Sequence, residues 1–434
     1  MNMLWIKNGR LVDPKSQTDK VCDICIERDR IAGITPAGTA EAKQRENDKI
    51  IDAEGLVVAP GLIDVHVHFR DPGFTYKEDV ATGAAAAAAG GYTTVICMAN
   101  TKPVVDNEET LKYLRNKAEN LPVHVLNTAA ITKGFEGKEL TDMIGLKALG
   151  AVGFTDDGVP IKDTSVVLEA MKMAKALDVP LSFHEEDPAL IGSFGVNQGP
   201  VSVAVGVDGA PAVAEDVLVA RDCALALNSG ASVNIQHISS KTSVDIVRAM
   251  KALGGHIYAE ATPQHFSLTE EAVLEKGTLA KVNPPIRREA DREAIIQGLK
   301  DGTIDFIATD HAPHSSEEKA KDMKAAPSGM IGLETALALA VTHLVKPEHM
   351  SLMHLLEKLT TNPASLYHLD AGYIAVGGKA DMVLFSEDES WTVENSFRSK
   401  SSNSPFIGEK LQGKVKYTIC DGKIVYSDSE KLKE

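Results

Sequence analysis

Eight short apolar runs alternate with longer helical stretches in the middle of the chain, and no other feature restricts the fold as strongly. The runs lie at residues 61–67, 93–98, 123–127, 151–155, 181–183, 232–236, 256–259 and 304–308, and each has the length of a strand. Amphipathic or alanine-rich segments, such as 78–89, 165–177 and 242–253, separate them. This repetition predicts a parallel (β/α)8 barrel, the TIM-barrel fold of the α/β class.

Both ends of the chain have a different pattern, made of short alternating strands. These lie at residues 4–12, 21–26, 30–34, 50–53 and 56–58, and again at 380–385, 415–420 and 423–426. Asp421-Gly422, between the last two, is a strong signal for a two-residue hairpin. We therefore expect a small β-sandwich domain formed by residues 1–58 and 371–434, beside a catalytic barrel formed by residues 59–370.

Composition excludes several classes of protein. A formal net charge of −16 over 434 residues argues against a nucleic-acid partner, which would need a basic surface. The 5 cysteines are odd in number, and the C-x-x-C pair Cys22 and Cys25 lies in an alternating strand, so we expect packing rather than redox chemistry. Because no apolar run approaches the roughly 18 residues of a membrane span, and no signal-peptide core is visible, we expect a cytoplasmic protein without a membrane partner.

Imidazoles and carboxylates gather at the predicted carboxyl ends of the barrel strands, where barrel enzymes build their active sites. His66 and His68, at positions i and i+2 of the first strand, point to the same side. The later strands end at Asp156-Asp157, His184, His237 and Asp310. This donor set predicts a pair of divalent metal ions. The alternative, a polar structural cluster without a cation, would leave neighbouring carboxylates to repel each other.

A pair of divalent ions indicates a reaction type. Such ions lower the pKa of a shared water towards neutrality and polarise a carbonyl group. We therefore expect hydrolysis, or its reverse, at a carbon–nitrogen or ester carbonyl. A phosphoryl centre is less favoured, because the sequence has no glycine-rich phosphate loop at a helix start.

Six segments carry a resemblance to a known family. Residues 60–73 (PGLIDVHVHFRDPG), 98–103, 154–158, 281–287, 305–314 and 332–335 resemble the signatures of the amidohydrolase superfamily, and most closely those of class I bacterial dihydroorotases. The similarity covers nearly the whole chain. It implies a zinc-dependent dihydroorotase of pyrimidine biosynthesis, which interconverts L-dihydroorotate and N-carbamoyl-L-aspartate.

The resemblance also implies roles for individual residues at the metal centre. His66, His68 and Asp310 would hold one Zn2+ ion and His184 and His237 a second, with Asp157 and a hydroxide as bridges. Many relatives use a carboxylated lysine as the bridge, and this sequence has no lysine at that position. Asp310 would also act as the general base and return the proton to the leaving nitrogen.

The implied substrate contacts are His68, Arg70, Asn100, Asn283 and His314, with Ser328 and Gly329 in a substrate loop. Arg70 can present two N–H groups to the substrate carboxylate, or instead pair with Asp71 or Glu78. Asn100 can instead cap a turn, and His314 can lie outside the contact layer.

Other positions near the predicted site are less certain ligands or depart from the family pattern. Asp156 is expected to support Asp157 or cap a turn rather than to ligate. Ala99, Glu185, Gln264 and Ser328 depart from the family pattern without removing a ligand. We read the charged, glycine-bearing segment 312–332 as a mobile lid.

Two alternatives to dihydroorotase activity remain. One is another cyclic amidohydrolase of the hydantoinase or allantoinase kind, and the other is an inactive paralogue that serves as a scaffold. The resemblance further implies a homodimer and an association with aspartate carbamoyltransferase.

Overall fold

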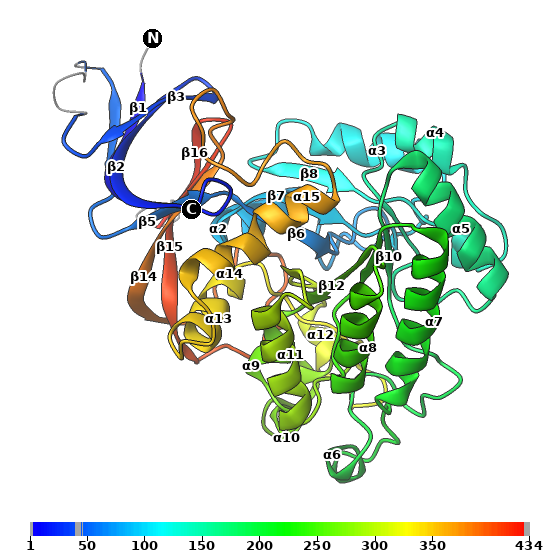
Figure 1. Ribbon diagram of the computed structural model, residues 1–434. Helices are drawn as coiled ribbons and strands as arrows, with labels where there is room; N and C mark the ends of the chain where they lie inside the picture. Colours follow the sequence, from blue (N-terminus) through cyan, green and yellow to red (C-terminus); the bar gives the residue numbers. More distant parts are fainter. Residues whose placement is uncertain (1–2, 40–44, 46, 429–434) are drawn as a thin grey trace.

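The computed structural model describes residues 3–39, 45 and 47–428, and its centre is a closed parallel barrel (Figure 1). Its strands are β6 (Leu62–Val67), β7 (Tyr92–Cys97), β8 (His124–Asn127), β9 (Phe154–Thr155), β10 (Leu181–Phe183), β11 (Val233–Ile235), β12 (Ile257–Ala261) and β13 (Phe306–Ile307). They pair in chain order as β6-β7-β8 and β9 to β13. Parallel bridges Ala129–Phe154 and Val67–His311 join the two sheets into a ring. The predicted (β/α)8 barrel is confirmed.

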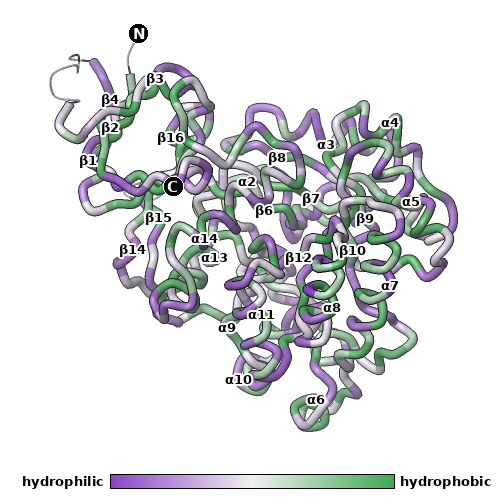
Figure 2. Tube along the Cα trace, viewed as in Figure 1, coloured by the Kyte–Doolittle hydropathy of each residue, from purple (hydrophilic) through white to green (hydrophobic). Residues whose placement is uncertain are grey.

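Helices surround the barrel on its outside (Figure 1). The longer ones are α2 (Val80–Ala89), α3 (Glu108–Ala118), α5 (Thr164–Leu177), α7 (Val213–Ser229), α8 (Lys241–Ala252) and α11 (Glu289–Asp301). Figure 2 shows hydrophobic and hydrophilic residues alternating along α7 and α8, as expected for helices that bury one side. Helices α2, α5 and α8 overlap the three predicted helical stretches 78–89, 165–177 and 242–253.

Shorter helical segments fill the connections and complete the last part of the barrel. They are η1 (Lys133–Phe135), α4 (Met143–Ala148), α6 (Pro200–Ala204), α9 (Pro263–Ser267), α10 (Ala272–Lys276), η2 (Gly277–Ala280), α12 (Ser316–Lys319), α13 (Ala336–Ala340), η3 (Val341–Val345), α14 (Leu352–Leu359) and α15 (Thr361–Leu366). Among the described residues, no helix combines the length and apolar character needed to cross a bilayer.

The alanine-rich helix α2 is tightly packed, because its small side chains allow close approach. Asp79 caps its first turn in a capping box with Thr82. A Cβ atom at Gly83 would lie 2.4 Å from the ring of Phe69, and one at Gly90 would lie 2.1 Å from a backbone oxygen. A larger residue at Gly83 would push α2 away from Phe69, which directly follows His68, and one at Gly90 would collide with the backbone at Leu333.

Strands from both ends of the chain form one mixed sheet beside the barrel, where the blue and red ribbons of Figure 1 meet. Its strands are β1 (Leu4–Asp13), β2 (Thr18–Glu27), β3 (Arg30–Pro36), β4 (Lys49–Asp52), β5 (Val57–Pro60), β14 (Met382–Thr392), β15 (Lys410–Cys420) and β16 (Lys423–Ser427). The order is β16-β15-β14-β5-β1-β2-β3, with β4 on β1. The sheet encloses its own apolar core.

This sheet contains the predicted hairpin turn and the C-x-x-C pair. Asp421 (φ 48°) and Gly422 (φ 69°) form the turn between β15 and β16, with the positive φ angles that the tight hairpin requires. Cys22 and Cys25 are buried in separate apolar clusters, which favours the packing role over a shared redox or metal site.

Candidate active site

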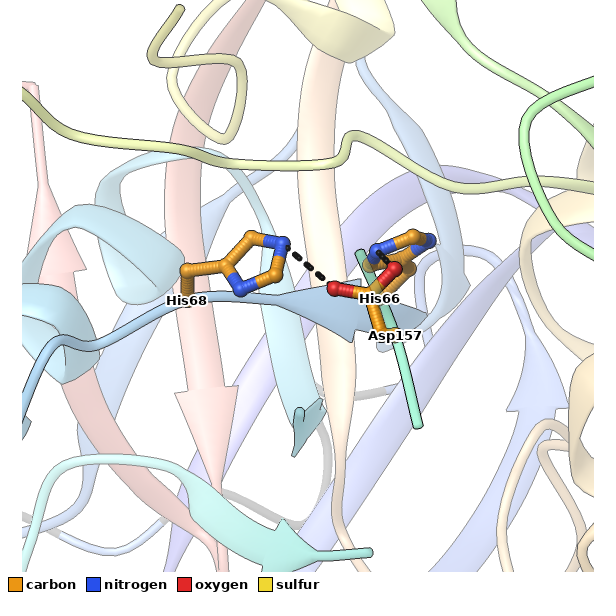
Figure 3. Close-up of side chains that lie close together, drawn as sticks. All are labelled: His66, His68 and Asp157. Carbon is orange, nitrogen blue, oxygen red and sulfur yellow. Dashed lines mark ion pairs between the residues drawn. The ribbon is translucent and has the colours of Figure 1, made fainter. Parts of the chain in front are cut away.

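The first group of potential metal ligands consists of His66 and His68, at the end of β6, and Asp157, the second residue after β9. The carboxylate of Asp157 lies between two imidazoles and points one oxygen at each (Figure 3). Its Oδ1 atom is 3.5 Å from Nε2 of His66, and its Oδ2 atom is 3.5 Å from Nε2 of His68. Because residues i and i+2 of a strand share a face, both rings reach the same point.

The second group shares Asp157 with the first. Nδ1 of His184, after β10, lies 3.7 Å from Oδ1 of Asp157 and 3.0 Å from Nε2 of His237, after β11. One ligand atom from each of these three residues lies within 4.8 Å of the others, and the same holds for His66, His68 and Asp157. Asp157 is therefore placed to face two ions at once.

Asp310 follows β13 and closes the cluster on a third side. Its Oδ1 atom is 3.0 Å from Nε2 of His68 and 3.6 Å from Nε2 of His66. Asp310 (φ 47°) and His237 (φ 33°) both have left-handed backbone angles, which non-glycine residues rarely adopt. Such strain persists only where the surroundings enforce it, and it is common at active sites.

Side-chain partners hold the outer nitrogen of three of the four imidazoles. Nδ1 of His66 donates to Oε1 of Glu260 (2.5 Å), and Nε2 of His184 donates to Oε2 of Glu186 (2.9 Å). Nδ1 of His68 lies 2.9 Å from Oδ1 of Asn100. A proton held on the outer nitrogen leaves the inner nitrogen of each ring with its lone pair towards the cluster.

Glu260 and Glu186 are missing from the sequence-based site. Two signals could have found them. Glu260 is an acidic residue inside the apolar strand β12, and Glu186 is an acidic residue two positions after His184. Neither signal is specific without the fold, because it does not say which ring the carboxylate meets.

The charges of the cluster favour a cation at its centre. Burial disfavours charge on His66, but Glu260 and Asp157 outweigh it and hold the pKa of that ring well above its usual range. Burial also opposes charge on His184, but Asp157 and Glu186 raise its pKa to about 10. Burial raises the pKa of Asp157, yet His66 and His184 bring it well below the usual value. A divalent ion supplies the positive charge that these carboxylates stabilise.

The residues fit the divalent ions that the donor set implies. Nε2 of His66 is buried and has no hydrogen-bond partner among the described residues, although such an atom normally finds one. It faces the carboxylates of Asp157 and Asp310, with the second ring of the strand beside it. Imidazole nitrogens and carboxylate oxygens are ligands that Zn2+ accepts.

Arg70 and His314 lie side by side at the mouth of the barrel. Nε of Arg70 donates to the carbonyl oxygen of Pro313 (3.3 Å), and one terminal nitrogen lies 3.4 Å from Nε2 of His314. The predicted alternative partners of Arg70 are engaged elsewhere. Asp71 pairs with Lys117 at 2.7 Å, and Glu78 contacts His311 at 3.3 Å.

His314 is held as a neutral ring. Its Nε2 atom lies 2.9 Å from the carbonyl oxygen of Ser328, and its Nδ1 atom lies 3.2 Å from Nζ of Lys77. The first contact requires a proton on Nε2, and the second requires a lone pair on Nδ1. Burial, with the charges of Arg70 and Lys77, lowers the pKa of His314 to about 2.

The remaining predicted contacts are placed as follows. Asn100 accepts from His68, as above, and donates from Nδ2 to Oδ2 of Asp157 (3.0 Å), so its amide belongs to the cluster. Oδ1 of Asn283 is buried and has no hydrogen-bond partner within the described part of the chain. Gly329 has φ 130°, and a Cβ there would lie 3.1 Å from Nε2 of His314.

Asp156 lies next to Asp157 but turns away from the cluster. It accepts hydrogen bonds from the backbone N–H groups of Ile131 (2.8 Å) and Thr132 (3.0 Å) and from the Thr132 hydroxyl. This agrees with the expectation that Asp156 supports a turn rather than a metal.

Two buried lysines anchor the segment 312–332. Nζ of Lys281 donates to the carbonyl oxygens of residues 323 and 326, both at 2.7 Å. Nζ of Lys319 donates to those of residues 327 and 329, both at 3.0 Å. Ser328 and Gly329 are therefore held in place from two sides, and the predicted movement of this segment as a lid stays a prediction.

The barrel, the terminal sheet and the shared Asp157 define the class of protein. The fold matches that of an L-hydantoinase (dihydropyrimidinase) from Arthrobacter aurescens, with a TM-score of 0.88 and 25% identity over 100% of this chain and 98% of the other. A D-hydantoinase matches with a TM-score of 0.85, 23% identity, and coverage of 99% and 96%. The chain thus has the fold of these cyclic amidohydrolases.

Comparisons with other sequences identify the family within this class. Residues 55–243 match the family model described as dihydro-orotase-like. The chain is 60% identical to a dihydroorotase of Clostridioides difficile over 98% of this chain and 100% of the relative. It is 57% identical to a dihydroorotase of Clostridium acetobutylicum, with the same coverage. It belongs to the dihydroorotase family.

Proposed function

We propose that the protein is a dihydroorotase, which reversibly hydrolyses the cyclic amide of L-dihydroorotate to N-carbamoyl-L-aspartate. The observation that carries this proposal is the cluster around Asp157, in a chain that is 60% identical to a dihydroorotase over 98% of its residues. The reaction needs an activated water, a polarised carbonyl and a group that moves one proton.

The cluster would hold two divalent ions, which we propose to be zinc. His66, His68 and Asp310 would hold one, His184 and His237 the other, and Asp157 would contact both. Two such ions would make a nucleophilic water available near neutral pH and polarise the amide carbonyl.

Asp310 moves the proton in this proposal. Its carboxylate would accept one proton from the attacking water and deliver it to the ring nitrogen as the carbon–nitrogen bond breaks, so that Asp310 returns to its ionised state. The second proton of the water leaves when the new carboxyl group of the product ionises. Burial raises the pKa of Asp310, but its hydrogen bond with His68 and the charge of His66 lower it below the usual value. Asp310 is therefore ionised and ready to accept when the reaction starts.

Arg70 and its neighbours would bind the substrate. The guanidinium of Arg70 can bind the substrate carboxylate with two parallel N–H groups. The ring of His314 lies beside Arg70, and the amides of Asn100 and Asn283 and the backbone at Ser328 and Gly329 would add further substrate contacts. The neutrality of His314 leaves Arg70 to supply the positive charge for this carboxylate.

A hydantoinase-type activity is the second candidate, because solved structures of that class share the fold. Hydantoin lacks the carboxylate that Arg70 would bind. Assays of the metal-loaded protein with L-dihydroorotate and with hydantoin separate the two: we expect turnover of the first and little of the second. Turnover of hydantoin alone would support the alternative, and turnover of neither by a protein with bound metal would support an inactive paralogue.

The family resemblance supports further proposals about the protein as a whole. We propose a cytoplasmic homodimer that associates with aspartate carbamoyltransferase and is divided into a barrel (59–370) and a terminal domain (1–58 with 371–434). Light scattering of the purified protein, alone and with the carbamoyltransferase, tests both associations. A monomer that does not bind the carbamoyltransferase would contradict them.

A further inference from the structure

Glu260 of strand β12 touches both halves of the candidate metal centre. Its Oε1 atom lies 2.5 Å from Nδ1 of His66 and 3.2 Å from the backbone nitrogen of His237. Its Oε2 atom accepts from Nδ2 of Asn234 at 3.2 Å. The exposed fraction of Glu260 is 0%, so these contacts replace all the water that a carboxylate would otherwise bind.

The two histidines that Glu260 holds belong to different metal subsites. The His66 ring points Nε2 at Asp157 and Asp310, whereas the His237 ring points Nε2 at His184. Glu186, by contrast, is hydrogen-bonded to the ring of His184 and serves one subsite. Oε1 of Glu260 thus contacts one candidate ligand of each metal subsite, His66 and His237.

We propose that Glu260 is a positioning residue shared by the two metal subsites, so that its loss weakens the binding of both ions. This inference rests on the proposed two-metal function.

The effect on each ligand has a physical cause. At His66, the carboxylate keeps the proton on Nδ1 and so directs the Nε2 lone pair inward. At His237, it holds the N–H group of a residue with φ 33°, a backbone conformation that needs such support. Removing the charge weakens both hydrogen bonds, because a carboxylate accepts more strongly than an amide.

Glu260→Gln tests the proposal with little change in shape. The amide oxygen can still face His66 and His237, and the new NH2 group would face Asn234. Oδ1 of Asn234 has no hydrogen-bond partner in the described structure, so a flip of that amide would accept the new donor. The variant therefore removes the charge and keeps the packing.

Glu186→Gln is the matched control, since it makes the same chemical change beside one subsite. Each protein, stripped of metal, is titrated with Co2+ and Zn2+ against a chelator of known affinity, and the absorption bands of bound Co2+ are recorded. We expect wild-type protein to bind two equivalents. In Glu260→Gln both affinities should fall, by about 10- to 100-fold, as for other residues that orient metal ligands. In Glu186→Gln one affinity should fall.

The outcomes separate this inference from the proposed function. If the wild-type chain binds no metal, the two-metal function itself is wrong. If wild-type binds two equivalents and Glu260→Gln loses affinity at neither site or at one only, Glu260 is not a shared positioning residue. If Glu260→Gln fails to fold by circular dichroism, Glu260→Asp serves instead. It keeps the charge but withdraws the carboxylate, so both affinities should again fall, and unchanged affinities would overturn the proposal.

Discussion

Oδ1 of Asp310 lies 3.0 Å from Nε2 of His68, and both side chains are buried at the end of the barrel strands. In the proposed mechanism Asp310 would both hold a metal ion and contact the reacting atoms. We expect Asp310→Ala to keep its fold and to lose activity by about 10²- to 10⁴-fold, the usual contribution of a general acid or base. Circular dichroism and steady-state kinetics on the metal-loaded variant check this. More than a tenth of wild-type activity would contradict the assigned role.

Arg70 is predicted to recognise the substrate carboxylate. Arg70→Lys keeps the positive charge but loses the planar pair of N–H groups. We expect kcat/KM for L-dihydroorotate to fall about 10- to 100-fold, which corresponds to roughly 1.4–2.7 kcal/mol. Metal content should not change. Residual turnover of hydantoin serves as the control, because that ring has no carboxylate; an equal loss on both substrates would point to a structural effect.

Lys281 is predicted to keep the segment 312–332 ordered. Lys281→Ala removes the donor to the carbonyl oxygens of residues 323 and 326, and these carbonyls would then turn to solvent. We expect faster proteolytic cleavage within the segment, and a slower rate again when substrate is bound. Lys324→Ala, at an exposed lysine of the same segment, is the control. Equal cleavage of both variants would argue against the anchoring role.

The same experiment on wild-type protein tests the lid. Cleavage at equal rates with and without substrate would contradict a lid movement.

His314 is predicted to make stability depend on pH. Burial and the charge of Arg70 hold its folded-state pKa at about 2, whereas an unfolded histidine titrates near 6.5. Below about pH 6.5 the unfolded chain gains a proton that the folded chain does not, so stability falls as the pH falls. Between pH 7.5 and 5.0 the wild-type protein should lose about 2 kcal/mol more than His314→Asn.

Denaturant unfolding of the metal-free proteins at both pH values measures this difference. Equal losses in the two proteins would show that His314 is protonated in the folded state at pH 5.0.

The sequence predicts the barrel well because each strand is a local signal. The run at 181–183 coincides with β10 (Leu181–Phe183), and the hairpin at Asp421-Gly422 is local as well. The run at 151–155 is longer than β9 (Phe154–Thr155), since pairing with both neighbours reaches only its last residues. The order of the terminal sheet is not local: β14 pairs with β5 across more than three hundred residues, and no pattern in either strand specifies that partner.

In the candidate site too, some residues are predictable from the sequence and others are not. The cluster around Asp157 is visible in the sequence because its histidines and aspartates follow strands whose ends must meet. Glu260 and Glu186 are not, since the sequence does not say which ring nitrogen each carboxylate meets. The anchoring of the segment 312–332 by Lys281 and Lys319 is hidden for a similar reason: the lysines bind backbone oxygens, which carry no sequence signal.

The turnover of L-dihydroorotate, measured as metal is returned to chelated protein, tests the two-metal dihydroorotase function most directly. We expect the metal-free protein to be folded and inactive, and activity to rise with added Zn2+ until two equivalents are bound per chain. Full activity in the chelated protein, or no turnover when two equivalents are bound, would contradict it.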